Sequence, residues 1–70
     1  MTAFDPGAWV RQFEAVGGNY AVSPDGRLTT GYPIMGATVD EQQECCRLVG
    51  ELSADPARVA AVRQYVVGRP

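Results

Sequence analysis

The first part of the chain carries large apolar residues at helical spacing. In "FDPGAWVRQFEAVGG" these residues are Trp9, Val10, Phe13 and Val16. Residues that recur every three or four positions share one face of an α-helix. Asp5 can cap the first turn, and Pro6 follows at a position where the missing N–H costs nothing. Because Gly17 can end the helix in the left-handed conformation, we predict a helix over about residues 6–16.

The next segment, "NYAVSPDGRLTTGY", alternates between larger and smaller side chains around a turn signal. Pro24 presets φ for the first corner of a turn, and Gly26 accepts a positive φ. A type I turn with a glycine bulge predicts an antiparallel hairpin over about residues 19–32, with Val22 opposite Leu28. One face then carries Tyr20, Val22, Leu28, Thr30 and Tyr32. The other, smaller and more polar, carries Ala21, Ser23, Arg27, Thr29 and Gly31.

A capping box opens the third element. In "TVDEQQECCRLVGEL", Thr38 and Glu41 have the spacing at which each side chain bonds the other residue's backbone N–H. The apolar stripe behind them consists of Cys45, Leu48, Val49 and Leu52. We therefore predict a helix over about residues 39–52. Gly50 weakens its interior, and we expect this glycine to mark a close approach of another element.

The last segment repeats the Asp-Pro start at Asp55 and Pro56. Its apolar positions are Val59, Ala61, Val62, Tyr65 and Val66. They predict a helix over about residues 56–67, closed by Gly68. A short loop joins it to the preceding helix, so we expect the two to form an antiparallel or steeply crossed helical hairpin that packs on the inner face of the β-hairpin. In the connector after the hairpin, we expect Ile34 and Met35 to pack under the core.

These elements predict a small α+β domain in the order α-β-β-α-α, with a two-stranded antiparallel hairpin packed against three helices. Seventy residues allow one hydrophobic core, so we treat residues 1–70 as a single domain. Short chain ends are commonly disordered, and we expect this of roughly Met1–Phe4 and Gly68–Pro70.

Charge and composition exclude several kinds of function. The net charge of -2 argues against nucleic-acid binding, which depends on basic surfaces that neutralise phosphates. The chain has no histidine, and two cysteines alone cannot complete a four-ligand zinc site. It also contains no phosphate-binding glycine motif. We therefore expect no enzymatic activity, no metal and no cofactor.

The distribution of apolar residues gives no membrane signal. We expect no signal peptide, and the sequence shows no apolar run of the roughly 20 residues that span a bilayer. The expected location is the cytoplasm, where cysteines stay reduced.

The adjacent cysteines raise the question of a redox pair. Neighbours on a helix point about 100° apart, and the spacing differs from the Cys-x-x-Cys of redox motifs. Cys45 falls on the apolar stripe, so we expect it in the core. Cys46 lies beside the stripe, which leaves two alternatives. It is either partly buried against a neighbouring element, or an exposed thiol at an interface.

The hairpin is the best candidate for a binding surface. Its outer face has small side chains, and its open edges can accept an added strand or a flat partner surface. The candidate partner-binding residues are Asp25, Arg27, Thr29, Tyr32 and Cys46. Two alternatives remain for parts of this surface. In the first, Pro24, Asp25 and Gly26 serve only to make the turn. In the second, Tyr20 and Tyr32 with Arg27 resemble a base-stacking platform, which an acidic chain disfavours.

The functional hypothesis is a non-enzymatic module that binds another protein or protein complex. Small, acidic, motif-free chains are frequent among phage and mobile-element inhibitors of host defence, such as anti-CRISPR proteins. The alternative is a homodimer formed by surplus apolar surface on the first and last helices, with Trp9 and Phe13 as anchors if the first helix packs loosely. Nucleic-acid binding is a third, weaker hypothesis.

Overall fold

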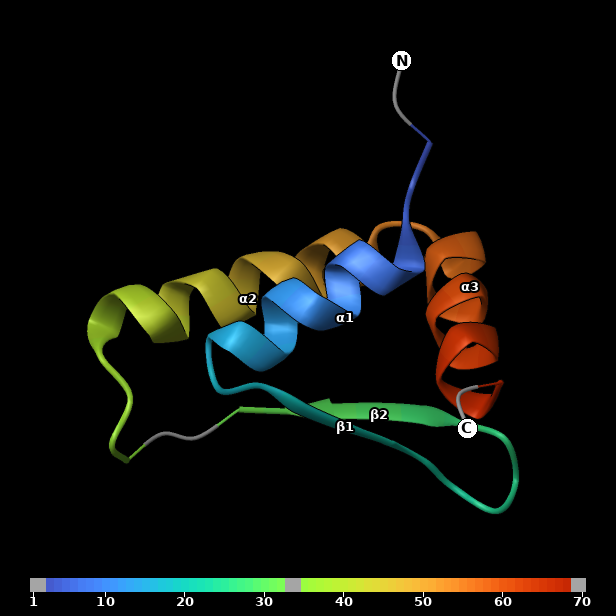
Figure 1. The fold of residues 1–70 in the computed structure, drawn as a ribbon, viewed down its shortest axis with the longest axis horizontal. Helices are drawn as coiled ribbons and strands as arrows, with labels where there is room; N and C mark the ends of the chain where they lie inside the picture. Colours follow the sequence, from blue (N-terminus) through green and yellow to red (C-terminus); the bar gives the residue numbers. More distant parts are fainter. Residues whose placement is uncertain (1–2, 33–34, 69–70) are drawn as a thin grey trace.

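The computed structural model describes residues 3–32 and 35–68. It confirms the α+β class and the predicted α-β-β-α-α order (Figure 1). The elements are α1 (Pro6–Ala15), β1 (Asn19–Val22), β2 (Leu28–Gly31), α2 (Val39–Ser53) and α3 (Pro56–Val67). Within the described residues no helix is long and apolar enough to cross a membrane.

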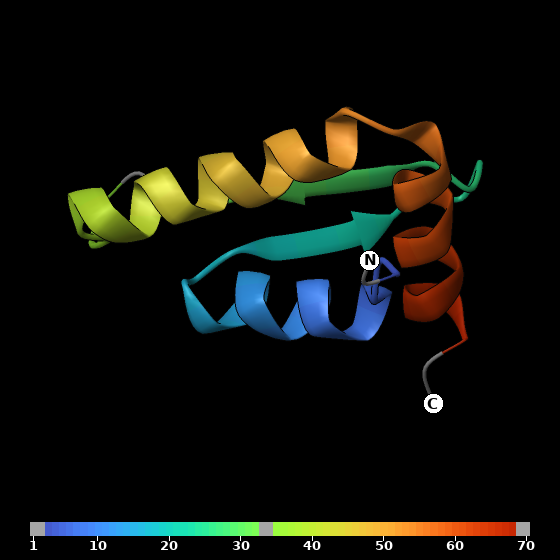
Figure 2. The same cartoon turned by 90° about the horizontal axis from the view of Figure 1, so that it is seen from above.

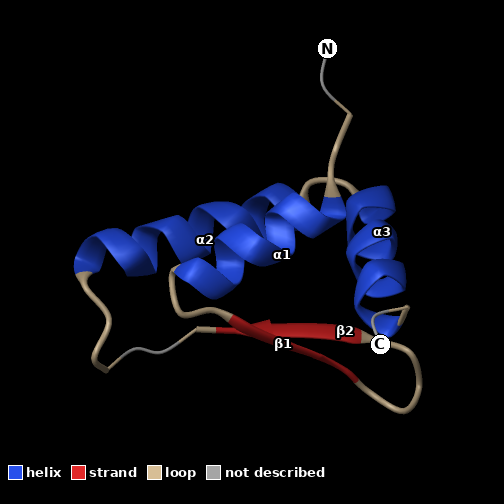
Figure 3. Ribbon diagram, viewed as in Figure 1, coloured by secondary structure: helices blue, strands red, loops and turns tan. Residues whose placement is uncertain are grey.

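The molecule has two layers. The hairpin forms one layer, and the helices lie on one of its faces (Figure 3). Seen from above, α1 and α2 run in opposite directions on either side of the hairpin, and α3 crosses steeply at one end (Figure 2). All three helices contact one another, and α3 also contacts β1. No helix or strand of the described residues covers the opposite face of the hairpin.

The helix ends form as their sequence signals predict. The Asp5 side chain accepts a hydrogen bond from the backbone of Ala8 at 3.2 Å, and Asp55 caps α3 in the same way. Thr38 and Glu41 form the reciprocal capping box of α2. Each cap satisfies backbone donors that a helix start leaves without partners. These local bonds fix where the three helices begin.

The hairpin has the predicted register. Val22 lies opposite Leu28, and Tyr20 lies opposite Thr30. The turn is closed by a bond from the Gly26 N–H to the Ser23 carbonyl at 2.8 Å, and Gly26 has a φ of +86°. A glycine tolerates this left-handed conformation without steric cost. The turn chemistry thus sets which side chains face the helices.

One hydrophobic cluster joins the three helices. Its buried members are Trp9, Val10, Phe13, Cys45, Leu48, Leu52 and Val62. Phe13 is fully buried and stacks on Trp9 with ring centroids 4.7 Å apart. The Trp9 Nε1–H donates to the Leu48 carbonyl at 2.9 Å, which gives the buried indole a polar partner. The core stripes predicted for all three helices therefore meet as expected.

One prediction about the connector after the hairpin and one about the chain ends are wrong. Met35 is 89% exposed rather than packed under the core, and Ile34 lies outside the described residues. Phe4, expected to be disordered, is half-buried and packs against the core, with the Arg58 guanidinium 5.6 Å from its ring centroid. Gly68 forms the C-cap of α3. The N-terminal segment is held because Phe4 covers apolar surface that the helices leave open.

Gly50 does not mark a close approach. It is exposed in the interior of α2, and a Cβ built there would meet nothing within 4 Å. The prediction that Gly50 marks a close approach is therefore wrong, because no neighbouring element comes near enough to require a residue without a side chain.

Replacing Gly50 with alanine is expected to stabilise the protein by up to about 1 kcal/mol, since alanine loses less backbone entropy in a helix. Urea unfolding followed by circular dichroism measures the change. Unfolding at a lower urea concentration than the parent would show that the glycine is required in the native state.

Candidate functional site

The turn at the hairpin tip uses the carboxylate of Asp25 for its own structure. This carboxylate accepts hydrogen bonds from the Ser23 hydroxyl and from the Arg27 backbone N–H. The hydrogen bond from Ser23 is the main reason why the pKa of Asp25 lies below its usual value. Asp25 is exposed, yet its polar atoms already serve the turn, as one of the two sequence interpretations expected.

Arg27 differs from Asp25 because its charged group is free. Its backbone bonds Ser23 across the turn, while its guanidinium makes no hydrogen bond or ion pair within the described part of the chain. The side chain is exposed, close to the start of β2. An unpaired exposed cation can attract a carboxylate of a binding partner.

The outer face of the hairpin consists of small exposed side chains. Asn19 and Ala21 on β1 and Thr29 on β2 all belong to it. The Thr29 hydroxyl donates to the Ala21 carbonyl across the strands at 3.2 Å. With its one hydroxyl proton engaged inside the hairpin, Thr29 presents mainly a methyl group and a flat surface.

The edge of β2 carries backbone groups without partners. Ser23 N–H donates to the Arg27 carbonyl at 2.9 Å, so these two residues form a hydrogen-bonded pair. Such pairs alternate along an antiparallel ladder, which makes Leu28 and Thr30 point their N–H and C=O groups outward. Within the described chain nothing accepts or donates to these outward groups of β2. The hairpin therefore has an open edge.

Tyr32 and Cys46 join the end of the hairpin to α2. The Tyr32 hydroxyl and the Cys46 Sγ lie 3.0 Å apart, and either atom can donate. Both residues are exposed, Tyr32 by 36%. The hydrogen bond to Cys46 is the main reason why the pKa of Tyr32 lies above its usual value. Of the two alternatives for Cys46, the exposed thiol holds.

The five candidate residues do not form one compact site. Asp25 and Arg27 lie at the turn, whereas Tyr32 and Cys46 meet beyond the opposite end of β2. Thr29 lies between these two groups, on the outer face. The candidate residues are therefore spread along the length of β2. They form an elongated surface and not a pocket.

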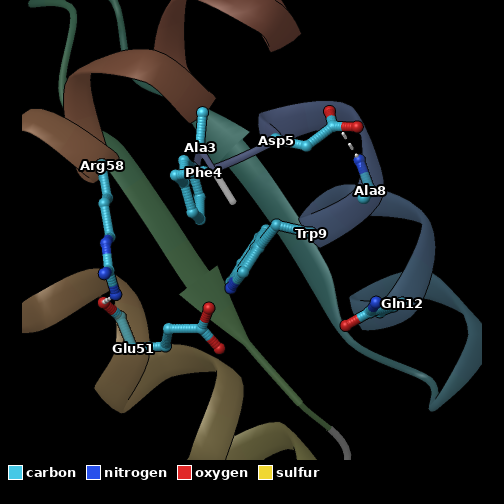
Figure 4. A pocket seen from close by; sticks show the side chains of 8 residues that line it. All are labelled: Ala3, Phe4, Asp5, Ala8, Trp9, Gln12, Glu51 and Arg58. Atoms are coloured by element: carbon cyan, nitrogen blue, oxygen red, sulfur yellow. Dashed lines mark hydrogen bonds between the residues drawn. The ribbon is translucent and has the colours of Figure 1, made fainter. Parts of the chain in front are cut away.

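A pocket of about 250 Å³ lies elsewhere, between the N-terminal segment and the ends of the helices (Figure 4). Its lining residues are Ala3, Phe4, Asp5, Ala8, Trp9, Gln12, Glu51 and Arg58. The sequence did not indicate this pocket, because Phe4 was expected to lie in a disordered chain end. The one local signal in this segment is the Asp5-Pro6 start of α1, which follows Phe4 directly.

The charged groups of this pocket are largely engaged with the protein itself. Arg58 donates to the Glu51 carbonyl at 3.1 Å, and the Glu51 carboxylate pairs with Arg47 at 3.2 Å. Asp5 caps α1. The pocket holds two carboxylates, one guanidinium and two aromatic rings, without a nucleophile placed beside a base. Its geometry does not indicate a reaction class.

The described residues contain no group of three or more histidine, cysteine, aspartate or glutamate side chains that could hold a metal ion. The two cysteines are both free: Cys45 is buried and Cys46 is exposed. Burial is the main reason why the pKa of the Cys45 thiol lies above its usual value. Cys45 also points its Sγ at the Val16 carbonyl, 3.6 Å away.

Alkylation of the native protein is expected to modify Cys46 and leave Cys45 intact. Thiolate is the reactive form, and burial both hides Cys45 and disfavours its thiolate. Iodoacetamide labelling followed by peptide mass spectrometry measures both rates, and labelling in urea provides the control in which both thiols react. Equal labelling of the two thiols without urea would contradict the orientation of α2.

Comparison with known proteins finds no matching family model, no similar curated protein and no similar solved structure. Any functional proposal must therefore rest on the surface described above.

Proposed function

We propose that the protein works as a non-enzymatic module that binds another protein through the exposed side of its β-hairpin. The observation that carries the proposal is the open edge of β2, where the outward backbone groups of Leu28 and Thr30 have no partner within the described chain. Unpaired edges are common sites of strand addition and protein association.

The surroundings of this edge support the proposal. The helices cover only one face of the hairpin, so the outer face around Ala21 and Thr29 remains accessible (Figure 1). Arg27 adds an unpaired positive charge at one end of β2. A flat surface with an unpaired cation at one end suits recognition of a partner more than chemistry on a small substrate.

The alternative is a homodimer formed by the first and last helices, and its α1 part has less support, whereas α3 keeps Val67 63% exposed. The expected anchors on α1, Trp9 and Phe13, are only 3% and 0% exposed because they pack in the core. The narrower prediction of a phage or mobile-element inhibitor stays a prediction, since it concerns the identity of the partner. The proposal therefore names the surface and the kind of interaction.

Charge reversal at Arg27 and enlargement of Thr29 test this surface. We expect affinity capture with the tagged protein, from a lysate of the organism that carries the gene, to recover a stoichiometric partner. Arg27→Glu and Thr29→Arg should each raise the dissociation constant at least about tenfold, because they place wrong charge or bulk on the binding face. Titration calorimetry with the purified partner measures these constants.

Arg11→Glu provides the matched control, since Arg11 is exposed on α1 and away from the hairpin. It should leave the dissociation constant within about twofold. Retained binding by both hairpin variants, with loss in the α1 variant, would move the site to the helical side and overturn the proposal.

A further inference from the structure

We propose that the occupant of this surface is an extended segment of the partner, which adds to β2 as a third, antiparallel strand and places an acidic residue beside Arg27. The inference rests on the proposed function and names the form and chemistry of the partner that binds there.

Backbone hydrogen bonding gives the first argument. The outward N–H and C=O groups of Leu28 and Thr30 are two residues apart on one edge, as in the bonded positions of an antiparallel ladder. An added strand would satisfy both residues at once. Recognition of this kind depends on backbone groups for affinity and on alternate side chains for specificity.

The other edge of the hairpin is less available. Seen from above, α1 runs along the β1 side of the hairpin and α2 along the β2 side (Figure 2). The two strands differ in that β1 also packs against α3. Because β2 has no helix contact of this extent, it is the edge to which we assign the added strand.

The side of α2 next to this edge carries no charge. Val39, Gln43, Cys46 and Gly50 follow one another at helical spacing, and all four are exposed. The contact between Tyr32 and Cys46 shows that this side of α2 reaches the end of β2. The charged residues of α2 lie off this line, with Arg47 paired to Glu44 and Glu51. Uncharged side chains of the added strand fit beside α2.

Arg27 supplies the electrostatic complement and sets the direction. Its guanidinium is unpaired within the described chain and precedes β2 directly. In an antiparallel addition, the C-terminal end of the partner segment lies beside the start of β2. An acidic residue at that end would pair with Arg27, whereas a basic residue there would be repelled.

The variant Thr30→Pro tests the backbone argument. Proline removes the outward N–H at this position but leaves the ladder between β1 and β2 intact, because the bonded pairs are at neighbouring residues. Thr30→Val keeps the N–H and is the matched control. Circular dichroism and the melting temperature of both variants establish that each is folded.

The probe is a short acetylated peptide of alternating threonine and valine that ends in glutamate. On titration into the isotope-labelled full chain, the amide signals of Leu28 and Thr30 should shift and their hydrogen exchange should slow. Thr30→Pro should weaken binding at least about tenfold relative to Thr30→Val. The same peptide ending in lysine should bind several-fold more weakly, and salt should reduce that difference.

Three results would overturn the inference: no shift at millimolar peptide, shifts confined to the outer face, or equal binding by Thr30→Pro and Thr30→Val. The natural partner separates this failure from failure of the proposed function. If Thr29→Arg abolishes capture while Thr30→Pro retains it, the flat face binds and strand addition is wrong. If neither variant affects capture, the hairpin is not the binding surface and both proposals fail.

Discussion

Replacing Phe13 with alanine is expected to leave the protein largely unfolded at room temperature. Phe13 is 0% exposed and stacks on Trp9 in the cluster that joins all three helices. Removing a buried phenylalanine side chain costs about 3–5 kcal/mol. A single core in a chain below about 70–80 residues rarely supplies more than about 3–5 kcal/mol in total. The substitution therefore removes most or all of the available stability.

Far-ultraviolet circular dichroism and urea titration measure this loss. The control is Val67→Ala, at an apolar side chain that is 63% exposed near the end of α3. Substitution at exposed positions usually changes stability by less than about 0.5 kcal/mol. A folded Phe13→Ala variant that loses less than about 1 kcal/mol would show that the cluster around Phe13 is not the main source of stability.

Much of the fold could be predicted because its signals are local. The Asp-Pro starts, the capping box and the Ser-Pro-Asp-Gly turn each involve residues within four positions of one another. The turn also fixed the hairpin register, since a one-residue slip would move Val22 and Leu28 to the outer face. Helical periodicity then identified the core face of α1 and the burial of Cys45.

Features that depend on contacts far apart in sequence were not predicted. The pocket requires Phe4 to meet Arg58, and the contact of Tyr32 with Cys46 depends on how α2 lies alongside the hairpin. The wrong predictions for two residues have the same cause. Met35 and Gly50 were assigned to packed positions from residue type alone, whereas the path of the chain leaves both exposed.

In the candidate site, too, local features were predicted and features that depend on the folded structure were not. Periodicity correctly placed Thr29 on the outer face and Leu28 on the inner face. Turn chemistry offered the use of Asp25 by the turn as one of two interpretations. Nothing in the sequence indicated that Arg27 stays unpaired, because that depends on which side-chain hydrogen bonds form in the folded hairpin. An open edge follows from topology: a two-stranded sheet gives each strand only one neighbour. The binding surface is therefore a property of the assembled hairpin.

Replacing Gly18 with alanine is expected to destabilise the protein by about 1–3 kcal/mol, the usual cost of forcing extra atoms into a packed core. A Cβ built on Gly18 would lie 2.6 Å from three atoms of the Phe13 ring. The ring cannot easily move away, because it is fully buried and stacked on Trp9. The Gly18 N–H also donates to the Phe13 carbonyl at 2.8 Å, which fixes the backbone beneath the ring.

Gly50→Ala is the matched comparison, since the same methyl group is added where nothing lies within 4 Å. The two variants should shift the urea midpoint in opposite directions, Gly18→Ala downward and Gly50→Ala upward. The sign is decided by local space, because both substitutions reduce the entropy of the unfolded chain similarly. A Gly18→Ala variant as stable as the parent would mean that the Phe13 ring yields readily. The core would then be looser than its packing indicates, and the loss expected for Phe13→Ala would shrink with it.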